Sequence, residues 1–374
     1  MSLPELIPVN QVLLDGNEKK YLDQCIESGW ISSEGPFVRQ FEEQFAARMG
    51  RKHGIAVSNG SVALDVAVSA FGLGPGDEVI MPTFTIISCA AAVLRAGARP
   101  VLVDSDPLTW NMQAEQVRAR LTPRTKAIML VHIFGLPVDA DPIRRLAAEH
   151  GILVLEDAAE MHGQTYKGRP CGGLGEISTF SFYPNKHVTT GEGGMILTDD
   201  ERLTEKCRSL RNLCFQNKKR FVHEDLGWNF RMSNLQAALG VAQLERLDEF
   251  VSRKRRMGNL YTRLLADMPG LQLPLASVEY AENIYWVYGL LLEERVGFDA
   301  EEAMRRLRAL GVETRPFFWP MHEQPVLRRR GLFAGESYPV AERLARRGFY
   351  LPSGLGISET QIKQVAASVR SVFA

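Results

Sequence analysis

Strand-length apolar runs alternate with helical patterns from about residue 38 to residue 233 of this 374-residue chain, and this alternation limits the folds open to it. The runs GIAVS, EVIMP, PVLVD, KAIMLVHI, ILVLED, STFSF and GMILTD are apolar along nearly their whole length. Strands of this kind need cover on both faces, which helices provide in α/β proteins. The sequence therefore predicts a mainly parallel sheet flanked by helices.

The segments between the runs carry helical signals. FVRQFEEQFAARMG places Phe37, Val38, Phe41 and Phe45 at helical spacing. In SVALDVAVSAFG we expect a helix that Ser61 opens as its N-cap.

The alternation of apolar runs and helical patterns ends at about residue 233. SNLQAALGVAQLERLDEFVSRKRRMGNLYTRLLADM predicts one long helix or a broken pair, and NIYWVYGLLLE predicts a strand. A helix begun by Asp299 and a C-terminal helix follow. We therefore predict a large domain over residues 1–245 and a smaller α+β domain over residues 246–374.

Composition argues against several classes of protein. Lysine plus arginine and aspartate plus glutamate each number 44, whereas nucleic-acid-binding domains usually carry a basic excess. No apolar run reaches the length of a membrane span, and no secretory signal opens the sequence. The five cysteines form no CxxC pair and fit reduced thiols. We expect a cytoplasmic protein without nucleic-acid or membrane partners.

Open α/β sheets bind their ligands at the carboxyl ends of the strands, and this rule selects the candidate residues. The positions that follow predicted strand ends are Asn59 to Ser61, Pro82 to Ile86, Asp104, His132, Asp157 to Glu160 and Ser181 to Lys186.

Three of these positions suggest chemistry when they are taken together. Ser58-Asn59-Gly60-Ser61 joins a strand to a helix and suits a phosphate, although Ser61 could simply cap the helix. Asp157 ends an apolar strand, where an unpaired carboxylate is costly. Its partner could be the protonated nitrogen of pyridoxal phosphate, or Asp157 could be the N-cap of a following helix. Lys186 is a solvated turn residue or the amine that binds the cofactor aldehyde. The order of these three positions along the chain favours a shared cofactor-binding site over a separate structural role for each of them.

The ordered motifs resemble the DegT/DnrJ-type (StrS) nucleotide-sugar aminotransferases, which have the type I pyridoxal-phosphate-dependent fold of aspartate aminotransferase. The likeness runs from about residue 7 to the C-terminus. The motifs that carry it are GWISSEGPFVRQFE, SNGSVALDVA, GPGDEVIMPTFT, PVLVDSDP, TPRTKAIMLVHIFG, EDAAEMHG, TFSFYPNKHVTTGEGGMI, GWNFRMSNLQAALGVAQLERLD and TRPFFWPMHEQP.

The resemblance implies a role for each matching residue. Lys186 would bind the aldehyde of pyridoxal 5′-phosphate and later carry a proton between substrate and cofactor, which passes through its pyridoxamine 5′-phosphate form. Asp157 would pair with the pyridine nitrogen, and Glu160, where many relatives have glutamine, would lie near the 3-hydroxyl. The residues implied to hold the phosphate are Gly60, Ser61, Val62 and Ser181, with Asn229 reaching the neighbouring subunit's cofactor in a homodimer with shared active sites.

One position departs from the family pattern. Relatives commonly have an aromatic residue that stacks on the cofactor where this chain has Ile86, which offers only aliphatic contact. Phe84 lies two residues away and is either a substitute or a core residue.

The resemblance implies transamination, in which glutamate gives an amino group that the cofactor passes to a nucleotide-linked keto sugar. Relatives that act as dehydratases have histidine in place of the lysine; a binding or regulatory protein would not need both Lys186 and Asp157. GWISSEG, GWNFRMSN and TRPFFWPMHEQP most resemble members that aminate C4 of GDP-4-keto-6-deoxy-mannose, while UDP- and dTDP-linked sugars, and C3 amination, remain alternatives. The residues expected to contact the substrate are Trp30, Arg231, Arg315 and His322; no metal is expected.

Overall fold

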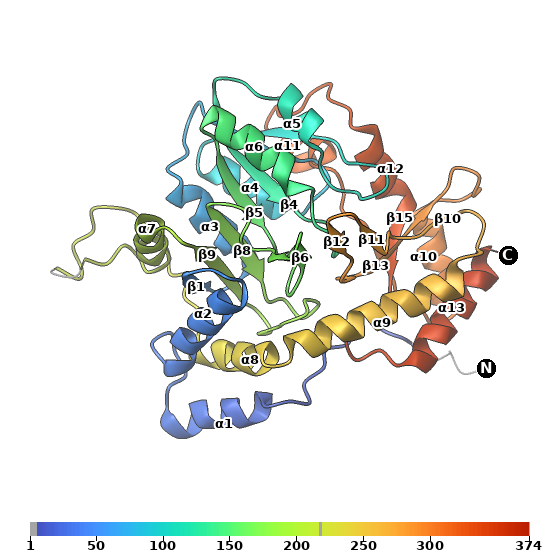
Figure 1. Ribbon diagram of the computed structural model, residues 1–374, viewed down its shortest axis with the longest axis horizontal. Coiled ribbons are helices and arrows are strands. Elements are labelled where there is room, and N and C mark those ends of the chain that lie inside the picture. The colour runs from blue at the N-terminus through green and yellow to red at the C-terminus, as the bar shows by residue number, and fades with distance from the viewer. Residues whose placement is uncertain (1–5, 217–218, 374) are drawn as a thin grey trace.

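The computed structural model describes residues 6–216 and 219–373, and a seven-stranded sheet forms the centre of that described part (Figure 1). Its strands are β1 (His53–Val57), β2 (Glu78–Pro82), β3 (Arg99–Val103), β4 (Thr125–Val131), β5 (Leu153–Asp157), β8 (Ile177–Ser181) and β9 (Gly194–Thr198). They lie in the order β1-β9-β8-β5-β4-β2-β3. β9 runs antiparallel to both of its neighbours, and the other pairs are parallel. The predicted mainly parallel sheet is confirmed.

Helices cover both faces of this sheet because successive strand residues point to opposite sides. In β4, Ile128 and Leu130 enter one hydrophobic core, and Met129 and Val131 enter the other. Helices of the first core are α2 (Pro36–Arg48), α5 (Ala114–Ala119), α6 (Ala140–His150) and α8 (Asn234–Leu244), with α1 (Glu18–Ser28) packed on α8. Those of the second core are α3 (Gly60–Ala70), α4 (Ile87–Arg95) and α7 (Glu201–Arg211).

A smaller antiparallel sheet belongs to the C-terminal part and has the strand order β10-β13-β15-β14. Its strands are β10 (Leu271–Gln272), β13 (Tyr288–Leu292), β14 (Arg315–Pro316) and β15 (Gly348–Leu351), and α9 (Leu247–Leu265), α10 (Ala300–Ala309) and α13 (Glu359–Phe373) share a third core with it. The remaining elements are the β6 (Thr165–Tyr166) and β7 (Arg169–Pro170) pair, the β11 (Ser277–Val278) and β12 (Ala281–Glu282) pair, η1 (Met321–Glu323), α11 (Pro325–Arg328) and α12 (Pro339–Arg347).

The long helical segment after residue 233 is a broken pair, one of the two predicted forms. α8 ends at Leu244 and α9 begins at Leu247, and α9 then runs from the large sheet to the small one (Figure 1). The predicted division at 245/246 falls in this break and stays a prediction. Side chains from both sides of it share one core, since the ring centroids of Phe317 and Phe134 lie 4.8 Å apart.

The start of α3 differs from the prediction. Asn59, not Ser61, is the N-cap, because its side chain accepts a 3.0 Å hydrogen bond from the Val62 amide. The Ser61 hydroxyl therefore has no capping role; it forms a 2.7 Å hydrogen bond with Ser88 at the start of α4. Ser61 is therefore able to contact a ligand at the helix N-terminus.

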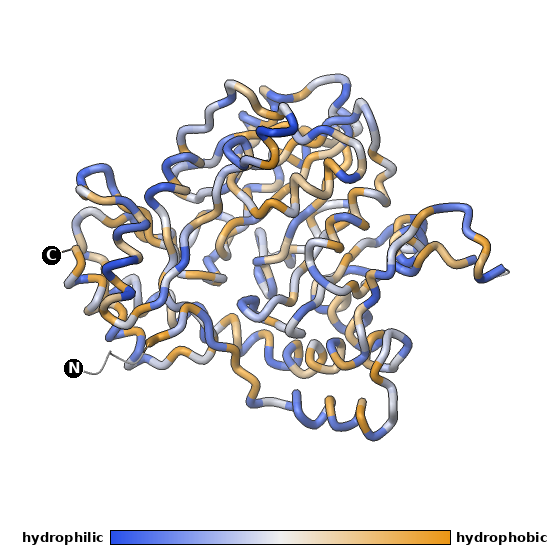
Figure 2. Tube along the Cα trace, turned by 180° about the vertical axis from the view of Figure 1, so that it is seen from behind, coloured by the Kyte–Doolittle hydropathy of each residue, from blue (hydrophilic) through white to orange (hydrophobic). Residues whose placement is uncertain are grey.

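Residues 213–216 and 219–227, here called the projecting loop, extend away from the body after α7 (Figure 1). Figure 2 shows apolar stretches through the body and apolar as well as polar residues in this loop. Phe221 and Leu226 are 80% and 91% exposed. Among the described helices, none combines the length and the apolar character that crossing a membrane requires.

Candidate active site

A cavity of about 920 Å³ opens at the carboxyl ends of the central strands, where the open-sheet rule places ligands. The segments that follow β2, β4, β5 and β8 contribute to its wall, as does the N-terminus of α3. The predicted site residues that line it are Gly60, Ser61, Val62, Ile86, Asp157, Glu160, Ser181, Lys186 and Arg315. Residues far apart in the sequence are thus brought to one cavity.

The N-terminus of α3 forms one end of this cavity. Gly60 packs so closely on β8 that a Cβ atom there would lie 2.6 Å from the Cβ of Ser181, so the position needs glycine. The Ser61 and Ser181 side chains flank this approach. Within the described part of the chain, the amides of Gly60 and Ser61 have no acceptor. These amides, two hydroxyl groups and the positive end of an 11-residue helix suit a phosphate group.

Asp157 lies in the cavity wall at the end of β5 and is only 4% exposed. Turns rather than a helix follow it, so the capping role considered from the sequence is excluded. Its carboxylate accepts hydrogen bonds from the Ala159 amide (3.1 Å) and the Cys89 thiol (3.3 Å). Burial raises the pKa of Asp157, while these donors and the charge of Lys186 oppose the rise. A cationic ring nitrogen beside it would stabilise the carboxylate.

Glu160 follows on the same turn and is almost buried. Burial raises its pKa from 4.5 to about 8, with the charge of Lys186 and the Phe134 amide opposing. That amide donates a 2.6 Å hydrogen bond to Oε2. Phe134 has a φ of 56°, an uncommon conformation for a bulky residue, and this strained backbone aims the amide at Glu160.

Lys186 lies in the loop between β8 and β9, where its amide bonds to the Tyr183 carbonyl at 2.9 Å. Its Nζ is 3.8 Å from the centroid of the Trp286 ring. Burial lowers the pKa of Lys186, and the charges of Glu160 and Asp157 oppose the decrease. A buried amine that sheds its proton readily is a suitable nucleophile for an aldehyde.

The two candidates for a stacking residue have different positions. Ile86 lines the cavity and is 45% exposed, whereas Phe84 is completely buried. The Phe84 ring packs against Phe134 and Phe317 at centroid distances of 5.9 and 6.0 Å. Phe84 is therefore a core residue, and the segment presents an aliphatic side chain to the cavity.

Four predicted residues do not line the cavity of this single chain: Trp30, Asn229, Arg231 and His322. Trp30 and Asn229 are exposed, and Arg231 donates to the side chains of Asn229 and Asn212 at 3.0 Å. His322 is 1% exposed, and both ring nitrogens are engaged, with Thr83 at 2.9 Å and Glu342 at 3.0 Å. This position gives no support to the predicted substrate contact of His322 and indicates a packing role.

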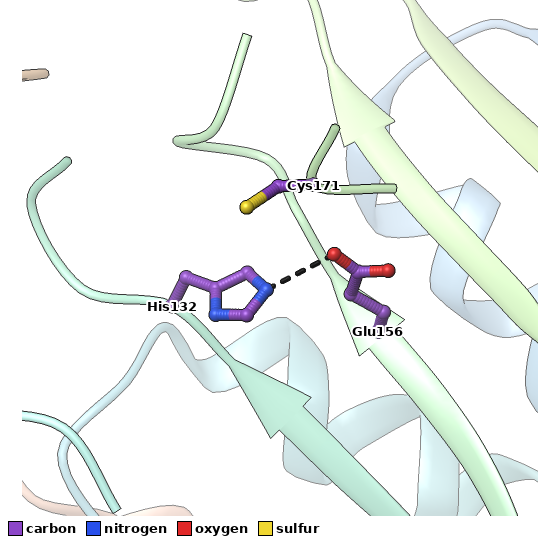
Figure 3. Close-up of side chains that lie close together, drawn as sticks. All are labelled: His132, Glu156 and Cys171. Atoms are coloured by element: carbon purple, nitrogen blue, oxygen red, sulfur yellow. Dashed lines mark hydrogen bonds and ion pairs between the residues drawn. The ribbon is translucent and has the colours of Figure 1, made fainter. Parts of the chain in front are cut away.

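His132, Glu156 and Cys171 form a buried cluster (Figure 3), and His132 is also part of the cavity wall. The Val138 amide donates to His132 Nδ1 at 3.0 Å, so Nε2 carries the proton and donates to Glu156 at 3.1 Å. The Glu156 carboxylate also accepts two backbone amides, at 2.6 and 2.8 Å. No imidazole lone pair is left for a metal, and the hydrogen bonds fix the backbone that ends β4 and β5.

Several cavity residues were not identified from the sequence. Trp286, Phe318 and Tyr350 line it from the C-terminal part, which the sequence does not place next to the sheet. The pattern around Trp286 indicated only a strand. Cys89, which bonds to Asp157, lies in an apolar helix and carries no local signal of its contact.

Comparison with known proteins identifies the family. Residues 13–370 match the DegT/DnrJ/EryC1/StrS aminotransferase family. The chain belongs to this aminotransferase family. The family's enzymes use pyridoxal 5′-phosphate, and the geometry at Gly60, Asp157 and Lys186 fits its phosphate, ring nitrogen and aldehyde.

Relatives from three bacteria are named GDP-perosamine synthase. The protein from Caulobacter vibrioides is 43% identical, with 96% of each chain covered, and that from Escherichia coli O157:H7 is 39% identical, with 98% of each covered. The crystal structure of the aminotransferase TlmJ from Streptoalloteichus hindustanus superposes with a TM-score of 0.91, at 32% identity and 98% coverage of each chain. The type I pyridoxal-phosphate-dependent fold, expected from the sequence, is confirmed.

Glu160 provides a test of the electrostatics. Its pKa is raised in the folded chain, so the folded state holds an extra proton between pH 4.5 and about 8, and the free energy of unfolding falls across that window. In cofactor-free protein, Glu160→Gln should be more stable than the wild type at pH 8.5 by on the order of 3 kcal/mol, with a much smaller difference at pH 5. Urea unfolding at the two pH values measures this; a difference independent of pH would contradict it.

Proposed function

We propose that this aminotransferase moves the amino group of glutamate to C4 of GDP-4-keto-6-deoxy-mannose and so produces GDP-perosamine. The observation that carries the transamination chemistry is the cavity in which Lys186, Asp157 and the N-terminus of α3 meet. The choice of sugar rests on the relatives named GDP-perosamine synthase, which match over nearly the full chain.

Each end of the cavity would hold one part of the cofactor. Gly60, Ser61 and Ser181 would bind its phosphate, with Val62, whose amide donates to Asn59, beside them in the cavity wall. Asp157 would keep the pyridine nitrogen protonated. Ile86 would give the ring an aliphatic contact. Bound pyridoxal 5′-phosphate supplies an aldehyde that carries the amino group and a ring that accepts electrons from the broken C–H bond.

Lys186 would bind the aldehyde through Nζ, since burial favours the neutral amine. Once displaced by the amino group of glutamate, the same Nζ would be free to take a proton from the substrate carbon and deliver it to the cofactor carbon. In the second half of the reaction, Nζ would move a proton in the opposite direction as the amino group passes to the keto sugar. A single lysine thus acts in both halves of the reaction.

Glu160 would donate a hydrogen bond to the oxygen of the cofactor's 3-hydroxyl. With a pKa of about 8, its carboxyl group is mostly protonated at neutral pH and can act as a donor, as the amide of glutamine does in other members. The strained Phe134 amide already occupies Oε2 and so orients the group.

Arg315 is the predicted substrate residue that lines the cavity of this chain. Arg315 on β14 pairs with Tyr350 on β15, and both residues line the cavity from the C-terminal part of the chain. A guanidinium there suits the diphosphate of a nucleotide sugar. A second candidate is a dTDP-linked substrate, because a dTDP-3-amino-3,4,6-trideoxy-alpha-D-glucose transaminase from Streptomyces venezuelae is 35% identical.

Assays with glutamate and GDP-, UDP- and dTDP-linked 4-keto-6-deoxy sugars test the assignment. We expect the GDP sugar to be aminated at C4 with a kcat/KM at least about tenfold above the others. Product masses and the NMR position of the new amine are the readouts. Turnover of only UDP- or dTDP-linked sugars would overturn the choice of nucleotide, and amination at C3 would overturn the position.

The active form is proposed to be a homodimer with shared active sites. Phe221, Leu226 and Trp30 are large apolar side chains that a single chain leaves exposed, which is costly unless a second copy covers them. Asn229 follows the projecting loop and does not reach its own cavity, which agrees with a contact to the neighbouring subunit's cofactor. We also propose a cytoplasmic location, consistent with five buried cysteines that form no disulfide.

Subunit mixing tests the sharing of sites. Lys186→Ala and Asn229→Ala homodimers should each have little activity, because every site lacks one residue. After refolding of an equal mixture, half of the dimers are hybrids, and one of their two sites has both native residues. Activity should therefore recover to about a quarter of the wild-type value. An active Asn229→Ala homodimer, or no recovery despite hybrid dimers detected by native mass spectrometry, would contradict the shared site.

A further inference from the structure

The Trp286 ring lies directly against the amine of Lys186. Lys186 Nζ is 3.8 Å from the centroid of the indole, well within the range of a cation–π contact. Trp286 is 5% exposed and contributes to the cavity wall, so the contact is shielded from bulk water. Such shielding strengthens a cation–π contact compared with an exposed one.

Two hydrogen bonds hold Trp286, one at its indole and one at its main chain. Its Nε1 donates a 2.8 Å hydrogen bond to the carbonyl of Asn185, the residue before Lys186. The main-chain carbonyl of Trp286 accepts a 2.8 Å hydrogen bond from Nζ of Lys254, a buried side chain of α9. The ring is therefore fixed relative to the backbone that carries Lys186.

The nearby carboxylates have other partners. Asp157 accepts from the Ala159 amide and the Cys89 thiol, and Glu160 accepts from the Phe134 amide. Within the described residues, neither forms an ion pair with Lys186 at 4.0 Å or less. Among the described residues, the indole face therefore lies closer to Nζ than either carboxylate does.

We propose that the face of Trp286 holds the ammonium group of Lys186 while the lysine is free of the cofactor and carries its proton. Trp286 is thus a positioning residue that acts through Lys186. In the half of the cycle in which the cofactor carries the amino group, a free lysine on a four-carbon stem has several rotamers. The indole face limits these rotamers and keeps Nζ beside the reacting carbons. This inference rests on the proposed Schiff-base role of Lys186.

The test measures the pKa of Lys186 in the full-length protein loaded with pyridoxamine 5′-phosphate, in which the lysine is free. The rate at which an acylating reagent labels Lys186 is followed against pH by peptide mass spectrometry. The midpoint of the curve of labelling rate against pH gives the pKa of Lys186, whatever the accessibility of the amine. The other titratable groups that face Lys186, unchanged in every variant, are Asp157, Glu160, His162, His187 and Lys254.

Two substitutions separate the ring face from the indole hydrogen bond. Trp286→Phe and Trp286→Leu both lose the bond to Asn185, but only phenylalanine keeps an aromatic face. We expect Trp286→Leu to lower the proton affinity of Lys186 by about three- to tenfold, and Trp286→Phe by clearly less. Trp319→Leu, at an exposed tryptophan outside the cavity, should leave the midpoint unchanged.

Equal midpoints in the phenylalanine and leucine variants, or a wild-type midpoint in Trp286→Leu, would overturn the proposal. If the leucine variant does not fold, Trp286→Met makes the same comparison. Borohydride fixation of pyridoxal 5′-phosphate onto Lys186 in the same variants keeps the two hypotheses separate. Fixation together with equal midpoints rejects only the role of Trp286, whereas no fixation in the wild type rejects the role of Lys186.

Discussion

The arrangement depends on one costly interaction, the burial of an amine together with two carboxylates at the carboxyl edge of the sheet. Removal from water disfavours the charged form of each group, so Lys186 has a lowered pKa while Asp157 and Glu160 have raised ones. Their mutual attraction offsets part of this cost. The same electrostatics give the lysine nucleophilic character, keep Glu160 a hydrogen-bond donor, and leave Asp157 in need of a cation that the cofactor ring can provide.

Residues on the opposite face of the sheet hold the strand end that carries Asp157. Glu156 and Asp157 are neighbours on β5 and therefore point to opposite faces. Asp157 faces the cavity, and Glu156 accepts bonds from His132 and from two amides in the buried cluster of Figure 3. One strand end thus carries a reactive side chain on one face and its anchor on the other, which limits movement of the carboxylate toward the ring.

Much of the fold and of the candidate site could be predicted from the sequence, because strand patterns and the residues that follow each strand can be read from short segments of the chain. The apolar runs predict the mainly parallel sheet, and the positions that follow these runs include Asp157 and Lys186. The cap of α3 was wrong by two residues, since asparagine and serine both cap helices and only the geometry decides between them. Trp286 was missed because its contact with Lys186 spans 100 positions of sequence, and the buried location of His322 depends on packing between Thr83 and Glu342. Contacts between the two subunits of the proposed dimer are not described by the structure of a single chain.

The central claim is that Lys186 is the residue that binds the cofactor. Full-length protein loaded with pyridoxal 5′-phosphate is reduced with sodium borohydride and digested, and its lysine peptides are examined by mass spectrometry. We predict a reduced pyridoxyl group on the Lys186 peptide, accompanied by loss of the cofactor's visible absorbance, and no such adduct in Lys186→Ala. Fixation on a different lysine, or an active enzyme in which no lysine is modified, would contradict the account.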